Sequence, residues 1–261
     1  MRDRERKILV VLPTYNERAT LPRVIADIHA ALPEADILVV DDGSPDGTGP
    51  LADTLADTRP WLTVHHRAGK LGLGTAYVHG FRIAIAGGYR FVAEMDSDGS
   101  HLARELPTLL AAAEGGAGLA IGTRWIPGGS IENWPWIRRA ISRTGTAIAR
   151  IALRSSLRDL TSGFRVLDTD WLRRLDLGGL DSHGYAFQVE TAWQLERLGC
   201  PVAEVPIRFV ERAGGHSKMS LGIVLEALAN VIRWGVELRL GRGGAPAHQG
   251  RAPKDPPTQR S

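Results

Sequence analysis

Short apolar runs alternate along this chain with stretches in which apolar residues recur every three or four positions. Runs of this length fill buried parallel strands, and the intervening periodicity is that of helices with one buried face. The alternation predicts a doubly wound, Rossmann-like α/β fold with a mostly parallel sheet flanked by helices. The predicted strands are residues 7–12, 36–40, 62–65, 91–95, 119–122 and 202–210, and the predicted helices cover about 21–31, 72–86, 103–113 and 190–198.

A further helix is predicted over residues 137–154, with two tryptophans, Trp134 and Trp136, at its entrance. At ~100° per residue its arginines form one stripe and its apolar residues a second stripe beside it. Such a helix suits a protein lying on an anionic membrane, but also a core-facing helix with a solvated basic face. The basic stripe is Arg139, Arg143, Arg150 and Arg154, and the apolar one is Ile137, Ile141, Ala147, Ile148 and Ile151.

Residues 219–240 are largely apolar and, at ~1.5 Å per residue, long enough to span a bilayer. However, Glu226, Asn230, Arg233 and Glu237 form a continuous polar stripe that would be costly in lipid. We therefore expect an amphipathic helix on a membrane or on a partner, and no transmembrane span. Residues 241–261 are rich in Pro and Gly and are predicted to be disordered, which leaves residues 1–240 as the folded domain.

The composition bounds the class of protein. An apolar fraction of 43% over 261 residues is enough for a real core. A single cysteine, Cys200, excludes an internal disulfide and a cysteine-based zinc cluster, and indicates a reducing compartment. The charged residues 1–7 lead straight into an apolar run, so we expect no signal peptide and a protein that faces the cytoplasm. The net charge of the whole chain is +3, and residues 241–261 alone carry +3, so the rest of the chain is formally neutral. A neutral body disfavours a nucleic-acid-binding function.

Two aspartates, Asp96 and Asp98, follow the predicted strand 91–95 directly. Carboxylates this close repel each other unless a cation lies between them, and open α/β sheets bind ligands at the C-terminal ends of their strands. The pattern favours a divalent metal held by Asp96 or Asp98 and bridging to a phosphate-bearing substrate. A solvated turn is the alternative, since Asp, Gly and Ser are ordinary turn formers.

A second acidic pair, Asp41 and Asp42, follows the strand 36–40. Acids at two successive strand ends fit a nucleotide sugar, because one carboxylate can bind ribose hydroxyls while the metal site holds the diphosphate. Helix capping and turn formation are the alternative. Gly72 and Gly74 do not make a dinucleotide fingerprint, because position 77 is tyrosine and the pair does not follow the first strand.

Candidate cations lie at the same predicted edge and beyond it. Arg124 follows the strand 119–122, with a surface arginine as the alternative. Arg138 and Ser142 are four residues apart and share a helical face that could hold an incoming phosphate. Arg212, His216 and Lys218 bracket a glycine pair in a loop suited to closing over a diphosphate, and we expect the lone His216 to be structural rather than a metal ligand.

Taken together, these segments resemble the polyprenol (dolichol) phosphate mannose synthases, a group of inverting glycosyltransferases with a GT-A fold. The resemblance covers about residues 7–240. LPTYNE and VDDGSPDGT indicate only this glycosyltransferase class. NWP followed by R-x-x-x-S-R, together with the R-x-x-G-x-SKM loop, is narrower and indicates the mannosyl-phosphate branch.

The resemblance implies transfer of mannose from GDP-mannose to a polyprenyl (dolichyl) phosphate with inversion, giving a β-linked lipid-phosphate sugar. It implies Mg²⁺ or Mn²⁺ as cofactor. It also implies a peripheral protein at the cytoplasmic face of a membrane, which the protein would contact through its amphipathic helices or through a separate integral membrane partner. By the group's motifs, the residues implied to bind guanosine are Pro13, Tyr15, Glu17, Val40 and Asp42. Those implied to bind the diphosphate and the metal are Asp96, Ser97 and Asp98, and those implied to bind phosphates and mannose are Arg124, Arg212 and Lys218. The acceptor phosphate is implied to bind Arg138 and Ser142.

Asp98, Arg124, Arg138 and Ser142 are the residues expected to act most directly in the reaction. The chain departs from the group at Ser100, where many relatives have a glutamine that is a further metal ligand. The acceptor phosphate needs no general base, because its second pKa of ~6 leaves it largely dianionic at neutral pH. Alternative functions are a polyprenyl-phosphate glucosyltransferase that uses UDP-glucose and a non-catalytic GT-A adaptor at a membrane.

Overall fold

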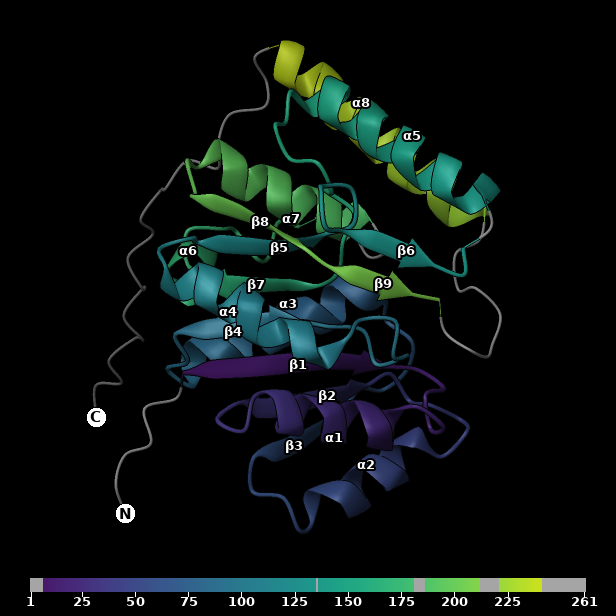
Figure 1. The fold of residues 1–261 in the computed structure, drawn as a ribbon, viewed down its shortest axis with the longest axis vertical. Helices are drawn as coiled ribbons and strands as arrows, with labels where there is room; N and C mark the ends of the chain where they lie inside the picture. The colour runs from purple at the N-terminus through teal and green to yellow at the C-terminus, as the bar shows by residue number, and fades with distance from the viewer. Residues whose placement is uncertain (1–6, 135, 181–185, 212–220, 241–261) are drawn as a thin grey trace, which may run out of the picture.

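A seven-stranded sheet forms the centre of the molecule in a computed structural model (Figure 1), which describes residues 7–134, 136–180, 186–211 and 221–240. The strand order is β3-β2-β1-β4-β7-β5-β8. All strands run parallel except β7, which is antiparallel to both of its neighbours. The strands are β1 (Ile8–Thr14), β2 (Asp36–Asp41), β3 (Leu62–His66), β4 (Phe91–Glu94), β5 (Leu119–Thr123), β7 (Arg165–Asp168) and β8 (Val202–Pro206).

The predicted parallel sheet is confirmed, with two differences. The antiparallel strand β7 was not predicted, because its short run carries Arg165 at a position that is fully buried. The single strand predicted over 202–210 was wrong, because the segment breaks after Pro206 into β8 and a separate β9 (Arg208–Val210). β9 pairs with β6 (Ser130–Glu132) in a small second sheet.

Helices cover both faces of the central sheet. α1 (Leu21–Ala31), α2 (Thr48–Ala56), η1 (Ala103–Glu105) and α4 (Leu106–Glu114) lie on one face, and α3 (Leu73–Ala86), α6 (Thr169–Leu172) and α7 (Ala186–Arg197) on the other. Alternate residues of each strand supply the two cores, as a pleated strand requires. Glu190 was expected to head a helix; this was wrong, because α7 begins at Ala186 and places Glu190 inside it, buried.

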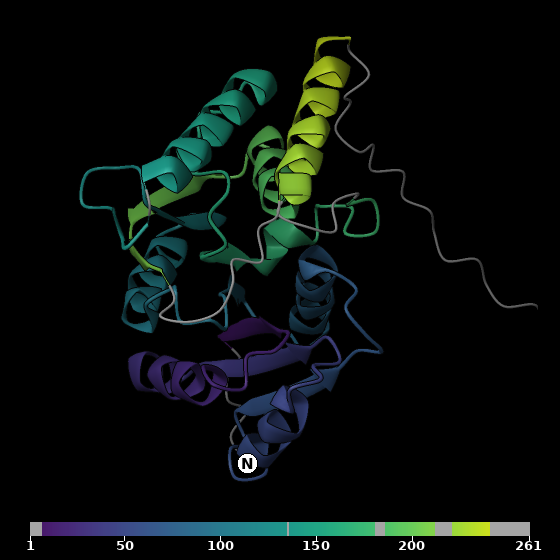
Figure 2. The ribbon, with the colours of Figure 1, turned by 90° about the vertical axis from the view of Figure 1, so that its right-hand side faces the viewer.

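The two predicted amphipathic helices are present as α5 (Trp136–Leu153) and α8 (Leu221–Arg239). They pack against each other beyond α7, at one end of the molecule (Figures 1 and 2). A Cβ atom on Gly235 would lie 2.9 Å from the carbonyl oxygen of Ala152, so the close approach of the helices requires glycine there. Arg239 donates to the same carbonyl over 3.1 Å and so satisfies an acceptor in the last turn of α5.

Large apolar side chains gather on the outside of this helix pair. Ile151 is 74% exposed and Trp136 76% exposed, so the apolar stripe of α5 is not a core-facing one. We call the following set the α5–α8 patch: Trp136, Ile141, Ile148, Ile151, Ile232, Val236 and Leu240. Within the described part of the chain, no helix combines the length and the hydropathy needed to cross a membrane. The predicted disordered tail, residues 241–261, lies outside the described residues.

Candidate active site

The C-terminal ends of β1 and β2 bring the first acidic pair to one edge of the sheet. The backbone N–H of Asp42 donates to the carbonyl of Thr14 over 3.0 Å. The Asp42 carboxylate is ion-paired with Arg67, just beyond β3, and accepts from the N–H of Leu71 over 3.2 Å. Arg67 was not singled out from the sequence, although it is a cation at the end of a predicted strand like Arg124. The positive charge of Arg67 balances the charge of the buried Asp42.

Asp41 organises the turn that follows β2. Its carboxylate accepts from the N–H of Ser44 over 3.1 Å and from the hydroxyl groups of Ser44 (2.5 Å) and Thr14 (3.2 Å). These bonds confirm the turn-forming interpretation for Asp41.

The other candidates for guanosine binding lie around the end of β1. Pro13 accepts from the hydroxyl of Ser97 over 2.7 Å, which joins this strand end to the DxD loop. Tyr15 is half-buried, with the ammonium group of Lys70 4.6 Å from its ring centroid. Glu17 is buried and accepts from Thr20. The Val40 side chain lies in the core, which leaves only its main chain for a ligand.

The second acidic pair lies in the loop after β4. Asp96 and Asp98 are both half-buried. Ser100 donates to Asp98 Oδ1 from both its hydroxyl (2.6 Å) and its backbone N–H (3.0 Å). Gly99, with φ at +79°, allows the backbone to turn back in this way. The loop is therefore a structured turn that orients one oxygen of Asp98.

His101 ends this loop and links it to the far side of the site. Its Nδ1 accepts from the N–H of Asp96 over 3.1 Å, and its ring stacks on Phe164 with centroids 5.0 Å apart. Burial lowers the pKa of His101 to about 4, the negative charge of Asp98 opposes this shift, and the positive charge of Arg124 adds to it. His101 also forms a β-bridge with Phe209 of β9.

An ion pair lies in the core directly behind the loop. Glu94 and Arg165 are both completely buried, with Oε2 and Nε 3.9 Å apart. Burial raises the pKa of Glu94 to about 7, and the positive charge of Arg165 opposes that shift. Neither residue was singled out from the sequence, because a charged residue in an apolar run carries no signal of where its partner lies.

Arg124 follows β5 and is buried, which excludes the alternative of a surface arginine. Its Nε and Nη2 donate to the two carboxylate oxygens of Asp159, each over 2.7 Å. Nη2 also donates to the hydroxyl of Thr161 over 2.9 Å. Asp159, which sequence reasoning missed, is fully buried.

The proposed acceptor residues lie on the first turns of α5. Arg138 is ion-paired with Glu211 at the end of β9, and its guanidinium lies 4.3 Å from the ring centroid of Trp134. Its Nε is buried and has no hydrogen-bond partner among the described residues. Ser142 is half-buried one turn further along the same helix, as the spacing predicted. Arg212, His216 and Lys218 lie outside the described residues.

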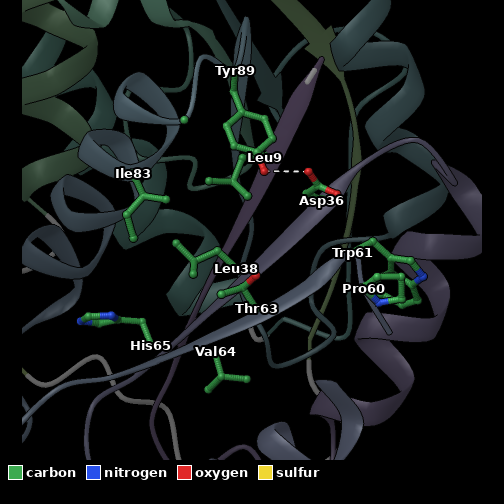
Figure 3. A pocket seen from close by; sticks show the side chains of 11 residues that line it. Leu9, Asp36, Leu38, Pro60, Trp61, Thr63, Val64, His65, Ile83 and Tyr89 are labelled. Atoms are coloured by element: carbon green, nitrogen blue, oxygen red, sulfur yellow. Dashed lines mark hydrogen bonds between the residues drawn. The ribbon is translucent and has the colours of Figure 1, made fainter. Parts of the chain in front are cut away.

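A pocket of about 230 Å³ lies elsewhere, on the α3 side of β2 and β3 (Figure 3). The hydroxyl of Tyr89 donates there to Asp36 over 2.6 Å. None of the predicted site residues lines it. Among the described residues, no cluster of three or more His, Cys, Asp or Glu side chains could enclose a metal on its own.

Comparison with known proteins gives a consistent picture. The family model for "Glycosyl transferase family 2" matches residues 9–176. The polyprenol monophosphomannose synthase of Mycolicibacterium smegmatis (strain ATCC 700084 / mc(2)155) is 47% identical over 237 residues, covering 90% of this chain and 89% of that protein. The undecaprenyl-phosphate mannosyltransferase of Micrococcus luteus is 49% identical over 233 residues, covering 89% of this chain and 96% of that protein.

Solved structures confirm the predicted GT-A fold. Glucosyl-3-phosphoglycerate synthase from Mycobacterium tuberculosis in complex with UDP has a TM-score of 0.61 at 23% identity, over 90% of this chain and 80% of that one. The complex of the same synthase with Mn²⁺, UDP and phosphoglyceric acid has a TM-score of 0.60 at 22% identity, covering 93% of this chain and 80% of that one. On the family match and the two relatives, the chain belongs to glycosyl transferase family 2.

Proposed function

We propose that this protein transfers mannose from GDP-mannose to the phosphate of a polyprenyl phosphate, with inversion at the anomeric carbon. The observation that carries the proposal is nearly full-length identity of 47–49% to a polyprenol monophosphomannose synthase and an undecaprenyl-phosphate mannosyltransferase. The position of Asp96 and Asp98 after β4 and of Arg124 after β5, at strand ends on one edge of the sheet, supports it.

Donor binding is assigned to the ends of β1, β2, β4 and β5. Tyr15, Glu17 and the main chains of Pro13 and Val40 would face guanosine. Both carboxylate oxygens of Asp42 accept a hydrogen bond, from Arg67 and from Leu71, so ribose hydroxyls would donate to the lone pair that remains on each oxygen. Arg212 and Lys218, from the loop after β9, would add contacts to phosphate and mannose.

Asp96 and Asp98 fit a divalent cation, with Ser97 beside them on the diphosphate. Mg²⁺ commonly takes one or two carboxylates and completes its shell with water and substrate phosphate oxygens, and two carboxylates are what this loop offers. When bound, such a cation, Mg²⁺ or Mn²⁺, would neutralise the charge that builds up on the departing GDP. Bound Mn²⁺ in the glucosyl-3-phosphoglycerate synthase complex supports a metal-dependent fold of this type.

The chain's own residues then have to hold two anionic substrates together. A dianionic phosphate attacks the anomeric carbon without a general base, so the absence of a dedicated proton acceptor is expected. Arg124 would stabilise the leaving diphosphate from a fixed position. Arg138 and Ser142 would place the attacking phosphate on the opposite side of the mannose, and the in-line displacement inverts its configuration.

Access to the lipid is assigned to the α5–α8 patch. It holds seven of the eight large, exposed apolar side chains of the described residues, and the exposed Arg139, Arg143 and Arg150 lie on the same helix pair. Apolar residues beside arginines suit the surface of an anionic bilayer. The acceptor residues lie on that same helix, α5. We therefore propose a peripheral protein on the cytoplasmic face of a membrane, with or without an integral membrane partner.

The test is incubation of the purified full chain and Mg²⁺ with labelled GDP-mannose and a short polyprenyl phosphate, followed by lipid extraction. Parallel reactions with UDP-glucose, GDP-glucose or no lipid separate the alternatives. Label in the lipid phase only with GDP-mannose supports the proposal. Transfer from UDP-glucose instead would overturn the donor assignment, and no transfer from any donor would favour a non-catalytic adaptor.

A further inference from the structure

We infer that Asp159 is a positioning residue for Arg124, which it orients and charge-balances so that Nη1 alone of the guanidinium meets the leaving diphosphate. This inference rests on the phosphate-binding role proposed for Arg124. It assigns a function to a buried acid between α5 and β7 whose side chain contacts no proposed substrate group directly.

The contact between the two residues is more extensive than an ordinary ion pair. Asp159 accepts three hydrogen bonds from Arg124: from Nε and Nη2 over 2.7 Å each, and from the backbone N–H over 3.2 Å. Thr161 accepts from Nη2 and itself donates to Asp159 over 3.1 Å. Both the main chain and the side chain of Arg124 are therefore held by one carboxylate, which fixes the plane of the guanidinium.

These bonds determine which part of Arg124 is available to a substrate. Nε and both N–H groups of Nη2 are in use, and among the described residues Nη1 has no hydrogen-bond partner. Aromatic rings surround the group, with the centroids of Trp125, Trp134 and Phe209 between 5.5 and 5.8 Å from Cζ. A phosphate oxygen would thus meet Nη1 alone, and rotation of the guanidinium to present a two-pronged edge would break the Asp159 bonds.

Asp159 also balances charge beneath the site. It is fully buried, and its negative charge raises the pKa of Arg165, while burial, the larger effect, lowers it. Glu94 also opposes that lowering, with its Oε2 3.9 Å from Arg165 Nε. The buried charges are thus two anions, Glu94 and Asp159, and two cations, Arg165 and Arg124. Removing the Asp159 charge leaves two buried cations with one anion, which would favour movement of Arg124 toward solvent.

The experiment is a double-mutant cycle in the mannosyl-transfer assay with Asp159→Asn, Arg124→Ala and the double variant. Asp159→Asn keeps the shape and removes the charge. Asp36→Asn is the matched control, because it makes the same change at an acid that accepts from Tyr89 over 2.6 Å beside the pocket that no predicted site residue lines. We expect Asp159→Asn to lower kcat by about 10²-fold, the scale of a lost transition-state donor. We expect the double variant to be no slower than Arg124→Ala, and Asp36→Asn to keep a kcat near that of wild type.

The outcomes separate this inference from the proposed function. A double variant much slower than Arg124→Ala, or an Asp159→Asn variant as active as Asp36→Asn, overturns the positioning role. If Arg124→Ala itself transfers normally, the phosphate role of Arg124 fails instead. If thermal melting shows that Asp159→Asn is not folded, Asp159→Glu replaces it in the same cycle. Asp159→Glu keeps the charge but displaces the carboxylate. If wild type transfers no mannose, the affinity for GDP with Mn²⁺ replaces kcat.

Discussion

Arg138 of α5 is ion-paired with Glu211, the residue that follows β9. The arginine proposed to take the acceptor phosphate therefore already holds an anion, while its buried Nε has no partner among the described residues. A dianionic phosphate has to displace or share this contact. Because a hydrogen bond to a charged group contributes ~1.5–3 kcal/mol, Arg138→Ala should raise the KM for polyprenyl phosphate by about 10-fold or more. The KM for GDP-mannose should change much less, and equal effects on both would argue against an acceptor role.

Glu211→Gln should act in the opposite direction. Without the competing carboxylate, Arg138 is available to the phosphate, so the KM for polyprenyl phosphate should fall while the KM for GDP-mannose stays near that of wild type. Glu132→Gln is the matched control, since Glu132 is ion-paired with Arg208 over 2.6 Å in the same small sheet. A fall in KM with both variants would indicate a general charge effect on the lipid anion rather than competition at Arg138.

Asp98→Ala should abolish mannosyl transfer while the fold survives, because the variant loses one of the two carboxylates proposed to hold the cation. Removal of divalent ions with EDTA should have the same effect on wild type, and Mg²⁺ or Mn²⁺ should restore it. Asp176→Ala, in an exposed turn where the acid accepts from the N–H groups of Gly178 and Gly179, controls for loss of a turn-forming aspartate. Normal turnover by Asp98→Ala would remove the metal assignment.

Ser100→Ala should weaken the cation site without destroying it. The Ser100 hydroxyl donates to Asp98 Oδ1 over 2.6 Å, while the backbone bond to the same oxygen remains in the variant. Loss of an outer partner of a metal ligand typically costs 10–100-fold in affinity, so the Mn²⁺ concentration for half-maximal activity should rise by about 10-fold. The maximal rate at saturating Mn²⁺ should be nearly unchanged; a lower maximal rate at an unchanged metal requirement would contradict this role.

Ile151→Glu should reduce binding of the full chain to vesicles of phosphatidylcholine with phosphatidylglycerol, because it adds a negative charge to the α5–α8 patch at a residue that is 74% exposed. Leu71→Glu is the control, since Leu71 is the one large exposed apolar residue of the described chain that lies away from that patch. Sedimentation with vesicles at low and high salt measures both. An equal loss of vesicle binding with Leu71→Glu would show that the α5–α8 patch is not what binds the membrane.

The sequence predicted best what depends on local periodicity. Apolar runs placed the strands that Asp42, Asp96 and Arg124 follow. β2, β1 and β4 pair in parallel, and β5 runs in the same direction across the antiparallel β7, so these strand ends lie at one edge. The pairing of Arg138 and Ser142 on one helical face also followed from spacing.

What the sequence did not predict depends on contacts between distant segments. Arg67 with Asp42, and Asp159 with Arg124, are 25 and 35 residues apart. No periodicity links such partners, and only the packed sheet brings them together. β7 was missed for the same reason, because Arg165 is tolerated in a buried strand only where Glu94 lies on the neighbouring one.

Gly235 determines how closely α8 packs against α5 and, through that contact, how the two helices are oriented relative to each other. With Ala152 against its bare backbone, any larger residue would wedge α8 away from α5 and roll the apolar surface relative to the turn that carries Arg138. The position of the proposed acceptor arginine relative to the proposed membrane surface should thus depend on the absence of a side chain at the opposite end of the helix pair.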